Sequence, residues 1–200
     1  MSADVYFSYL NRCPAHARLS FYVASQCAPV LKGIKASNMI TMEAGTWRIL
    51  RKAFQNSKVI CIPLSLGDEK DVLLLYRYGH LAGLLKEEKV IRFLRGCGYD
   101  RMDAASVIIR LRMRYQEYIS GHAPFPHELG VILEYPVEDV ESFIVNGGKN
   151  CLITRYWKVY HNKERAEEIF RLYDEARKTA IEEVLNGCPL AVIVENDGNR

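Results

Sequence analysis

The first half of the chain shows apolar side chains at helical spacing, bounded by residues that favour helix ends. Proline favours the first position of a helix because the N–H that it lacks would have no partner there. Pro29 therefore predicts a helix start that places Cys27 near the N-terminus of that helix. Together these signals predict helices over residues 2–11, 29–36, 46–56, 79–95 and 103–119.

Two apolar stretches in this half, 59–66 and 72–78, are joined by a short polar loop. A connection of this length between apolar runs is typical of a β-hairpin. We therefore expect two neighbouring strands here.

The second half of the chain alternates short apolar runs with amphipathic helical patterns. The predicted strands cover 129–134, 151–160 and 189–194, and the predicted helices cover 136–145 and 162–185. Strand, helix and strand at these lengths predict parallel pairs joined by right-handed crossovers. The expected fold is therefore α/β or α+β, with a mixed, partly parallel sheet flanked by helices and a C-terminal half built of βαβ units.

Composition and organisation indicate an ordinary globular protein. The hydrophobic content is 49% and the charged content 26%, and no linker or repeat divides the chain, so we expect one domain over residues 1–200. No apolar run approaches a membrane span, and the N-terminus lacks a secretory signal pattern. We therefore expect a cytoplasmic protein without a membrane partner, whose six widely spaced cysteines stay reduced.

The net charge of +3 is unevenly distributed. Basic residues gather between Lys89 and Arg114, whereas acidic residues gather in 134–141 and 164–175. Opposite fields within one small domain neutralise each other across the fold more often than they mark a binding face. Nucleic acid is therefore not the expected partner.

Cys27, His127 and Asp139 form a candidate catalytic set. Their order along the chain is that of papain-like thiol enzymes, in which a histidine removes the thiol proton and an acid orients the ring. A helix N-terminus would favour the Cys27 thiolate. The local papain signature is absent, however, and Asp139 has an adequate structural role as an acid in the first turn of a helix.

Metal and nucleotide motifs are absent from the sequence. The five histidines include no HExxH motif and no pair at helical spacing, and no glycine-rich phosphate loop is present. We therefore predict no metal site, and the sequence leaves the cofactor open.

Cations and aromatic side chains near the predicted strand ends suggest a ligand site instead. Such groups can combine a partly apolar pocket with clamps for phosphate or carboxylate. The structural alternative is that Trp157 belongs to the core and that the cations are solvated. The candidate ligand-binding residues are Lys35, Arg77, Glu128, Tyr135, Trp157 and Lys158.

Four segments, in this order, resemble the bacterial domain-of-unknown-function family 3793: QCAPVLKGIK (26–35), FLRGCGY (93–99), FPHELGVILEYPVEDVESFI (125–144) and YWKVY (156–160). The resemblance implies a cytoplasmic protein of bacterial origin and a single intact domain, and it brings no activity, cofactor or catalytic residue. Glu134 departs from the family pattern, which has glycine there, as do His161 and Asn162, which replace a Gly-Asp pair.

The function that we expect is the binding of a small anionic or aromatic ligand where the Cys27, His127 and Trp157 segments meet. A cysteine-dependent hydrolase or transferase using Cys27 and His127 is one alternative. A non-catalytic protein-interaction module, with Lys89–Arg114 or the C-terminal strand as the contact, is another. The oligomeric state and the question of catalysis stay open.

Overall fold

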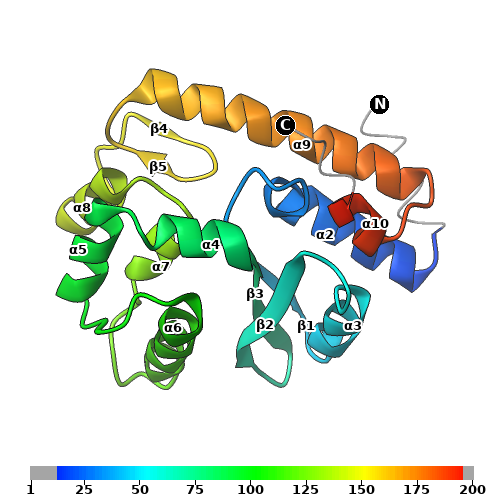
Figure 1. The fold of residues 1–200 in the computed structure, drawn as a ribbon, viewed down its shortest axis with the longest axis horizontal. Coiled ribbons are helices and arrows are strands. Elements are labelled where there is room, and N and C mark those ends of the chain that lie inside the picture. Colours follow the sequence, from blue (N-terminus) through cyan, green and yellow to red (C-terminus); the bar gives the residue numbers. More distant parts are fainter. Residues whose placement is uncertain (1–12, 196–200) are drawn as a thin grey trace.

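The computed structural model describes residues 13–195, and the helix predicted over 2–11 lies outside them (Figure 1). The helices are α2 (Ala15–Leu31), α3 (Thr46–Ala53), α4 (Tyr78–Leu84), α5 (Glu88–Gly96), α6 (Ala104–Ile119), α7 (Glu128–Ile132), α8 (Val137–Val145), α9 (Lys163–Leu185) and α10 (Leu190–Glu195). The strands are β1 (Ser37–Glu43), β2 (Val59–Leu66), β3 (Lys70–Arg77), β4 (Ile153–Thr154) and β5 (Lys158–Val159). Helices and strands are thus mixed in an α+β fold.

The larger sheet has the order β1-β3-β2, and both of its pairings are antiparallel. The predicted hairpin is confirmed as β2 and β3, whereas β1 had no counterpart among the expected elements. Side chains alternate across a strand. Accordingly, Leu73 and Leu75 of β3 enter one hydrophobic cluster, and Leu74 and Tyr76 enter another on the opposite face.

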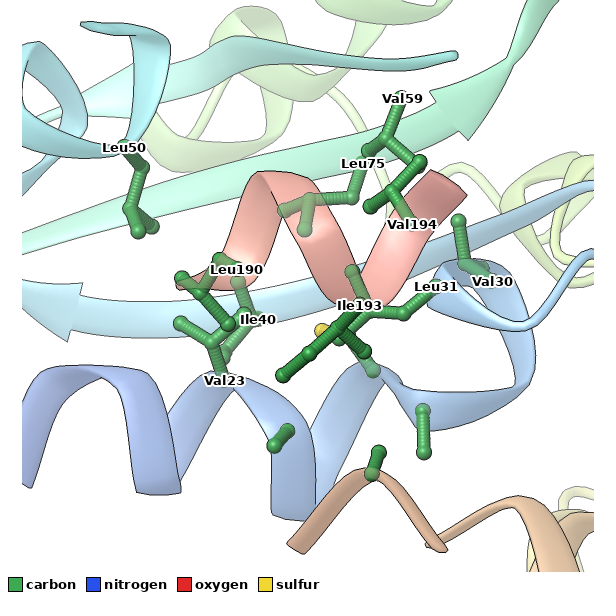
Figure 2. Packing of buried hydrophobic residues seen from close by; sticks show 14 of the residues in the cluster. Val23, Val30, Leu31, Ile40, Leu50, Val59, Leu75, Leu190, Ile193 and Val194 are labelled. Atoms are coloured by element: carbon green, nitrogen blue, oxygen red, sulfur yellow. The ribbon is translucent and has the colours of Figure 1, made fainter. Parts of the chain in front are cut away.

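The first cluster brings together α2, the sheet, α9 and α10. Figure 2 shows Leu190, Ile193 and Val194 of α10 packed between the sheet and α2. The long helix α9 runs beside α2 at one end and reaches the β4–β5 hairpin at the other (Figure 1). The second cluster packs the other face of the sheet against residues of α4 to α8.

The helices whose ends are set by local chemistry were predicted closely. Asp103 caps α6 by accepting a hydrogen bond from the Ser106 amide at 3.0 Å, and Asn162 caps α9 by accepting one from the Arg165 amide at 3.2 Å. Helix α8 follows Pro136 as expected. The helix predicted over 79–95 is two helices, α4 and α5.

The predicted parallel strands and βαβ units are wrong. Residues 129–134 lie mainly in helix α7, 189–194 lie mainly in helix α10, and 151–160 form the short antiparallel hairpin of β4 and β5. Short apolar runs fit a fully buried helix as well as a strand, because neither leaves a polar face for periodicity to detect. None of the described helices is both long and apolar enough to cross a membrane.

Candidate functional site

A mostly apolar cavity of about 300 Å³ lies among α7, α8 and the β4–β5 hairpin. We call it the aromatic pocket, because five aromatic rings line it. Its lining residues are Met39, Phe125, His127, Leu129, Gly130, Leu133, Tyr135, Asp139, Val140, Phe143, Trp157 and Lys158. All but Met39 come from the segment 125–160.

Close packing of backbone and rings shapes this pocket. Tyr135 stacks on Trp157 with ring centroids 5.4 Å apart and planes inclined by 25°. Helix α7 approaches α8 at Gly130, where a Cβ atom would lie 3.0 Å from Val140 Cγ2 and 3.4 Å from Tyr135 Cδ2. A side chain at position 130 would therefore push these walls apart or fill the space between them.

Asp139 is a buried carboxylate, and both of its oxygens accept hydrogen bonds from the chain. Its Oδ2 accepts from Trp157 Nε1 at 2.7 Å, and its Oδ1 accepts from the amides of Tyr160 at 2.8 Å and His161 at 2.9 Å. These bonds fasten α8 to the β4–β5 hairpin and to the start of α9. Asp139 therefore orients Trp157 and gives no sign of orienting His127.

His127 and Lys158 supply the remaining polar groups of the pocket. The His127 ring lies between Phe125 and Phe143, with centroid distances of 5.4 and 5.6 Å, and its nitrogens form no hydrogen bond within residues 13–195. Lys158 Nζ donates to the Gly148 carbonyl at 2.6 Å and lies 5.8 Å from the centre of the Phe143 ring. An ammonium has three donors, so a ligand acceptor in the pocket can take another.

The predicted position of Cys27 at a helix start is wrong. Helix α2 begins at Ala15, and Pro29 lies in its last turn, so Cys27 sits inside the helix near its C-terminal end. Pro29 lacks the N–H that would donate to the Ser25 carbonyl, and the helix ends two residues later. Cys27 is completely buried in the first hydrophobic cluster, and burial raises the pKa of its thiol to about 12.

Arg77 is also buried, and its guanidinium binds the chain itself. Nε donates to the Val30 carbonyl at 2.7 Å, and Nη2 donates to the carbonyls of Leu31 at 2.6 Å and Val194 at 3.2 Å. Arg77 thus satisfies carbonyl groups at the ends of α2 and α10, which is favourable for a cation near a helix C-terminus. It does not line the aromatic pocket.

Glu128 and Lys35 lie outside the aromatic pocket. Glu128 is buried in an ion pair with Arg114 Nε and accepts from the Tyr99 hydroxyl at 3.3 Å, so its environment is that of a structural carboxylate. Lys35 lies on another side of Tyr135, with Nζ 5.0 Å from the centre of that ring. Of the nine predicted site residues, the structure therefore places His127, Tyr135, Asp139, Trp157 and Lys158 around one cavity.

Several residues that line the pocket were not among the predicted site residues. Phe125 and Phe143 lie in the segment that supplies the predicted residues, and their spacing from His127 gave no sign that the three rings would meet. Met39 arrives on β1, a strand whose place is set by pairing with β3. Residues 13–195 bring no three His, Cys, Asp or Glu side chains together as a metal site would need.

A family model described as "Protein of unknown function (DUF3793)" matches residues 23–194. The chain belongs to this family. The DUF3793 match contains the entire lining of the aromatic pocket. Comparison with curated proteins and comparison with solved structures both give no match.

Proposed function

We propose that the protein binds a small aromatic ligand in the aromatic pocket. The observation that carries the proposal is the convergence of Phe125, His127, Tyr135, Phe143 and Trp157 around one cavity. Ligand sites are typically concave and mainly apolar, with a few placed polar groups. A cavity of about 300 Å³ is at the small end of such sites, which favours a compact ligand with one or two rings.

The polar groups around the pocket favour a ligand that carries a hydrogen-bonding substituent. The Asp139 oxygens are occupied by Trp157 Nε1 and two backbone amides, so this acid holds the wall in place. His127 can donate or accept, and Lys158 can donate. A phenol or a related hydroxylated or carbonyl-bearing ring therefore matches the pocket better than a plain hydrocarbon.

The alternative that uses Cys27 as a nucleophile has less support. A thiol attacks as its thiolate, and burial raises the pKa of Cys27 to about 12, which keeps it protonated at neutral pH.

The interaction-module alternative loses part of its basic surface to internal ion pairs. Lys89 pairs with Glu138, Arg92 with Glu88, Arg101 with Asp103 and Arg114 with Glu128. The bacterial origin and cytoplasmic location implied by the family resemblance stay predictions.

Calorimetric titration of the full chain with p-cresol and 2-naphthol tests the proposal, with cyclohexanol as the non-aromatic comparison. We expect both aromatic probes to bind and cyclohexanol to bind more weakly. Phe143→Ala removes one ring of the wall, and we expect it to weaken binding about fivefold to twentyfold. Phe93→Ala is the matched control, because Phe93 is also partly buried and lies outside this pocket.

Two results would refute the ligand-binding proposal. One is that neither aromatic probe, at millimolar concentration, gives a heat of binding or a signal in a competition experiment. The other is equal weakening by Phe143→Ala and Phe93→Ala, since a general loss of stability would then explain both.

A further inference from the structure

Lys35 is a buried cation without an acidic partner in the described chain. Lys35 follows α2 along the chain, and the residue is 2% exposed. Nζ donates to Asn38 Oδ1 at 3.0 Å and faces the rings of Tyr135 and Tyr173, at 5.0 and 5.7 Å from their centres. Within residues 13–195 it forms no ion pair. Buried charges are normally paired, so this ammonium has unused bonding capacity.

Glu134, the carboxylate that acts on the Lys35 charge, forms no ion pair with it within residues 13–195. Glu134 lies close enough to Lys35 to influence its charge, but Glu134 Oε2 accepts from the Ala36 amide at 2.5 Å. Desolvation lowers the pKa of Lys35 to about 8, which still leaves the amine mostly protonated at pH 7. The protein therefore carries a buried positive charge at neutral pH that the described residues neutralise only in part.

This ammonium lines a second cavity of about 460 Å³, which we call the Lys35 cavity. Its polar lining includes Gln26, Lys35, Asn38, Arg155, Asp174 and Arg177. In contrast to the aromatic pocket, most of these side chains carry a charge or an amide. The cavity has room for a small anion and for part of the molecule that bears it.

The charges around the Lys35 cavity are unbalanced. Asp174 is its single carboxylate, and both oxygens are engaged: Oδ2 with Arg155 Nη2 at 2.7 Å and Oδ1 with the Tyr156 hydroxyl at 2.8 Å. Arg177 of α9 forms no ion pair with the described residues. Lys35 and Arg177 thus remain as two uncompensated cations on the walls of one cavity.

We propose that the Lys35 cavity binds the phosphoryl group of a small molecule, with Lys35 and Arg177 as its cationic partners. A phosphoryl group carries about 1.5 to 2 negative charges at pH 7 and offers three acceptor oxygens. It therefore matches two uncompensated cations, and it can also accept from the side-chain amide of Gln26. Charge-assisted hydrogen bonds of this kind are short and strong. The inference does not depend on ligand binding in the aromatic pocket.

Titration with inorganic phosphate at pH 7 and constant ionic strength tests the inference on the full chain. We expect binding to weaken at least tenfold in Lys35→Met, because a buried charge-assisted hydrogen bond is lost. Arg177→Gln should weaken it about threefold, since Arg177 is exposed and its charge is screened. Lys178→Gln, the exposed neighbour on α9, is the matched control and should bind phosphate as the unmodified chain does.

A pH series separates a direct contact from a structural role of Lys35. The groups that influence the Lys35 charge are the Cys27 thiol and the Glu134 carboxylate, and Tyr135 and Tyr173 pack against it. Phosphate affinity should fall between pH 7 and pH 9.5, because Lys35 loses its proton near pH 8. The same decline should be absent in Lys35→Met.

Three outcomes would overturn the proposal. The first is the absence of phosphate binding, and the second is equal weakening in Lys35→Met, Arg177→Gln and Lys178→Gln. The third is acetate binding as tightly as phosphate at matched ionic strength, which would favour a carboxylate ligand. Unchanged p-cresol binding in Lys35→Met would show that any failure concerns the Lys35 cavity alone.

Discussion

The aromatic pocket and the Lys35 cavity share the side chains of Met39, Leu133 and Tyr135. The buried charges on their walls differ, however, in how many hydrogen-bond partners the chain gives them. In the aromatic pocket, Asp139 accepts three hydrogen bonds from the chain. In the Lys35 cavity, the ammonium has one amide oxygen and two ring faces. A charge whose partners are complete stabilises the fold, whereas a charge whose partners are incomplete indicates where a ligand would complete them.

The largest expected effect comes from removing the Asp139 carboxylate, which accepts three hydrogen bonds. Asp139→Ala leaves the Trp157 indole N–H and two backbone N–H groups buried without an acceptor, and we expect a loss of about 3–5 kcal/mol in the free energy of unfolding. Urea denaturation measures it. Asp174→Ala, which removes a carboxylate from the more exposed ion pair with Arg155, should cost about 1 kcal/mol. Equal losses would contradict the distinction between the two acids.

A second comparison sets two buried cations against each other. Arg77→Met leaves several backbone carbonyls without a donor, so we expect a loss of about 2–4 kcal/mol in the free energy of unfolding. Lys35→Met removes an incompletely paired charge and keeps the aliphatic stem, so stability at pH 7 should be unchanged or higher by about 1 kcal/mol. Chemical denaturation of both variants checks this. A larger loss for Lys35→Met than for Arg77→Met would show that Lys35 is a structural cation.

The pH dependence of stability gives a third test. Between about pH 8 and pH 10.5, unfolded Lys35 holds a proton that the folded state has released, so raising the pH favours the folded state. The stability penalty of Lys35 is therefore fully present below pH 8 and fades towards pH 10.5. The unmodified chain should therefore gain stability relative to Lys35→Met as the pH rises from about 8 to 10.5. Cys61, whose pKa burial raises to about 12, destabilises both proteins alike above pH 9. Cys27 differs between them, because Lys35 lowers the pKa of its buried thiol in the unmodified chain alone.

The smallest expected effect concerns Glu134, the carboxylate that opposes the lowering of the Lys35 pKa. Glu134→Gln keeps an oxygen that can accept from the Ala36 amide and removes only the charge. We expect phosphate affinity to change by less than about threefold, and stability by less than about 1 kcal/mol, because the backbone hydrogen bond is kept and Glu134 forms no ion pair with Lys35 within residues 13–195. Calorimetry and urea denaturation measure the two quantities. A tenfold change in phosphate affinity would show that Glu134 acts as the counter-ion of Lys35.

Features that depend on local chemistry could be predicted from the sequence. The caps at Asp103 and Asn162 and the start of α8 after Pro136 are set by residues within one helical turn. Five of the candidate site residues, His127, Tyr135, Asp139, Trp157 and Lys158, line the aromatic pocket. The family resemblance was confirmed by the match over residues 23–194.

Features that depend on distant partners could not be predicted. The residues of α7 and α10 form apolar runs whose helical state is decided by what surrounds them. Strand β1 exists through its pairing with β3, and without it Met39 and the Lys35 cavity have no place. The sequence also suggested that Lys35 and Arg77 act alike, because only the tertiary contacts show which of these cations already has its acceptors.

The alternation along β3 has a consequence for how the molecule comes apart. Leu73 and Leu75 belong to one hydrophobic cluster and Leu74 and Tyr76 to the other, so consecutive residues of a single strand serve both. Melting β3 exposes both clusters together, and neither half retains a complete hydrophobic surface on which to persist. Unfolding is therefore expected to be cooperative, with the β3 backbone opening last in amide hydrogen exchange because its opening requires the loss of both clusters.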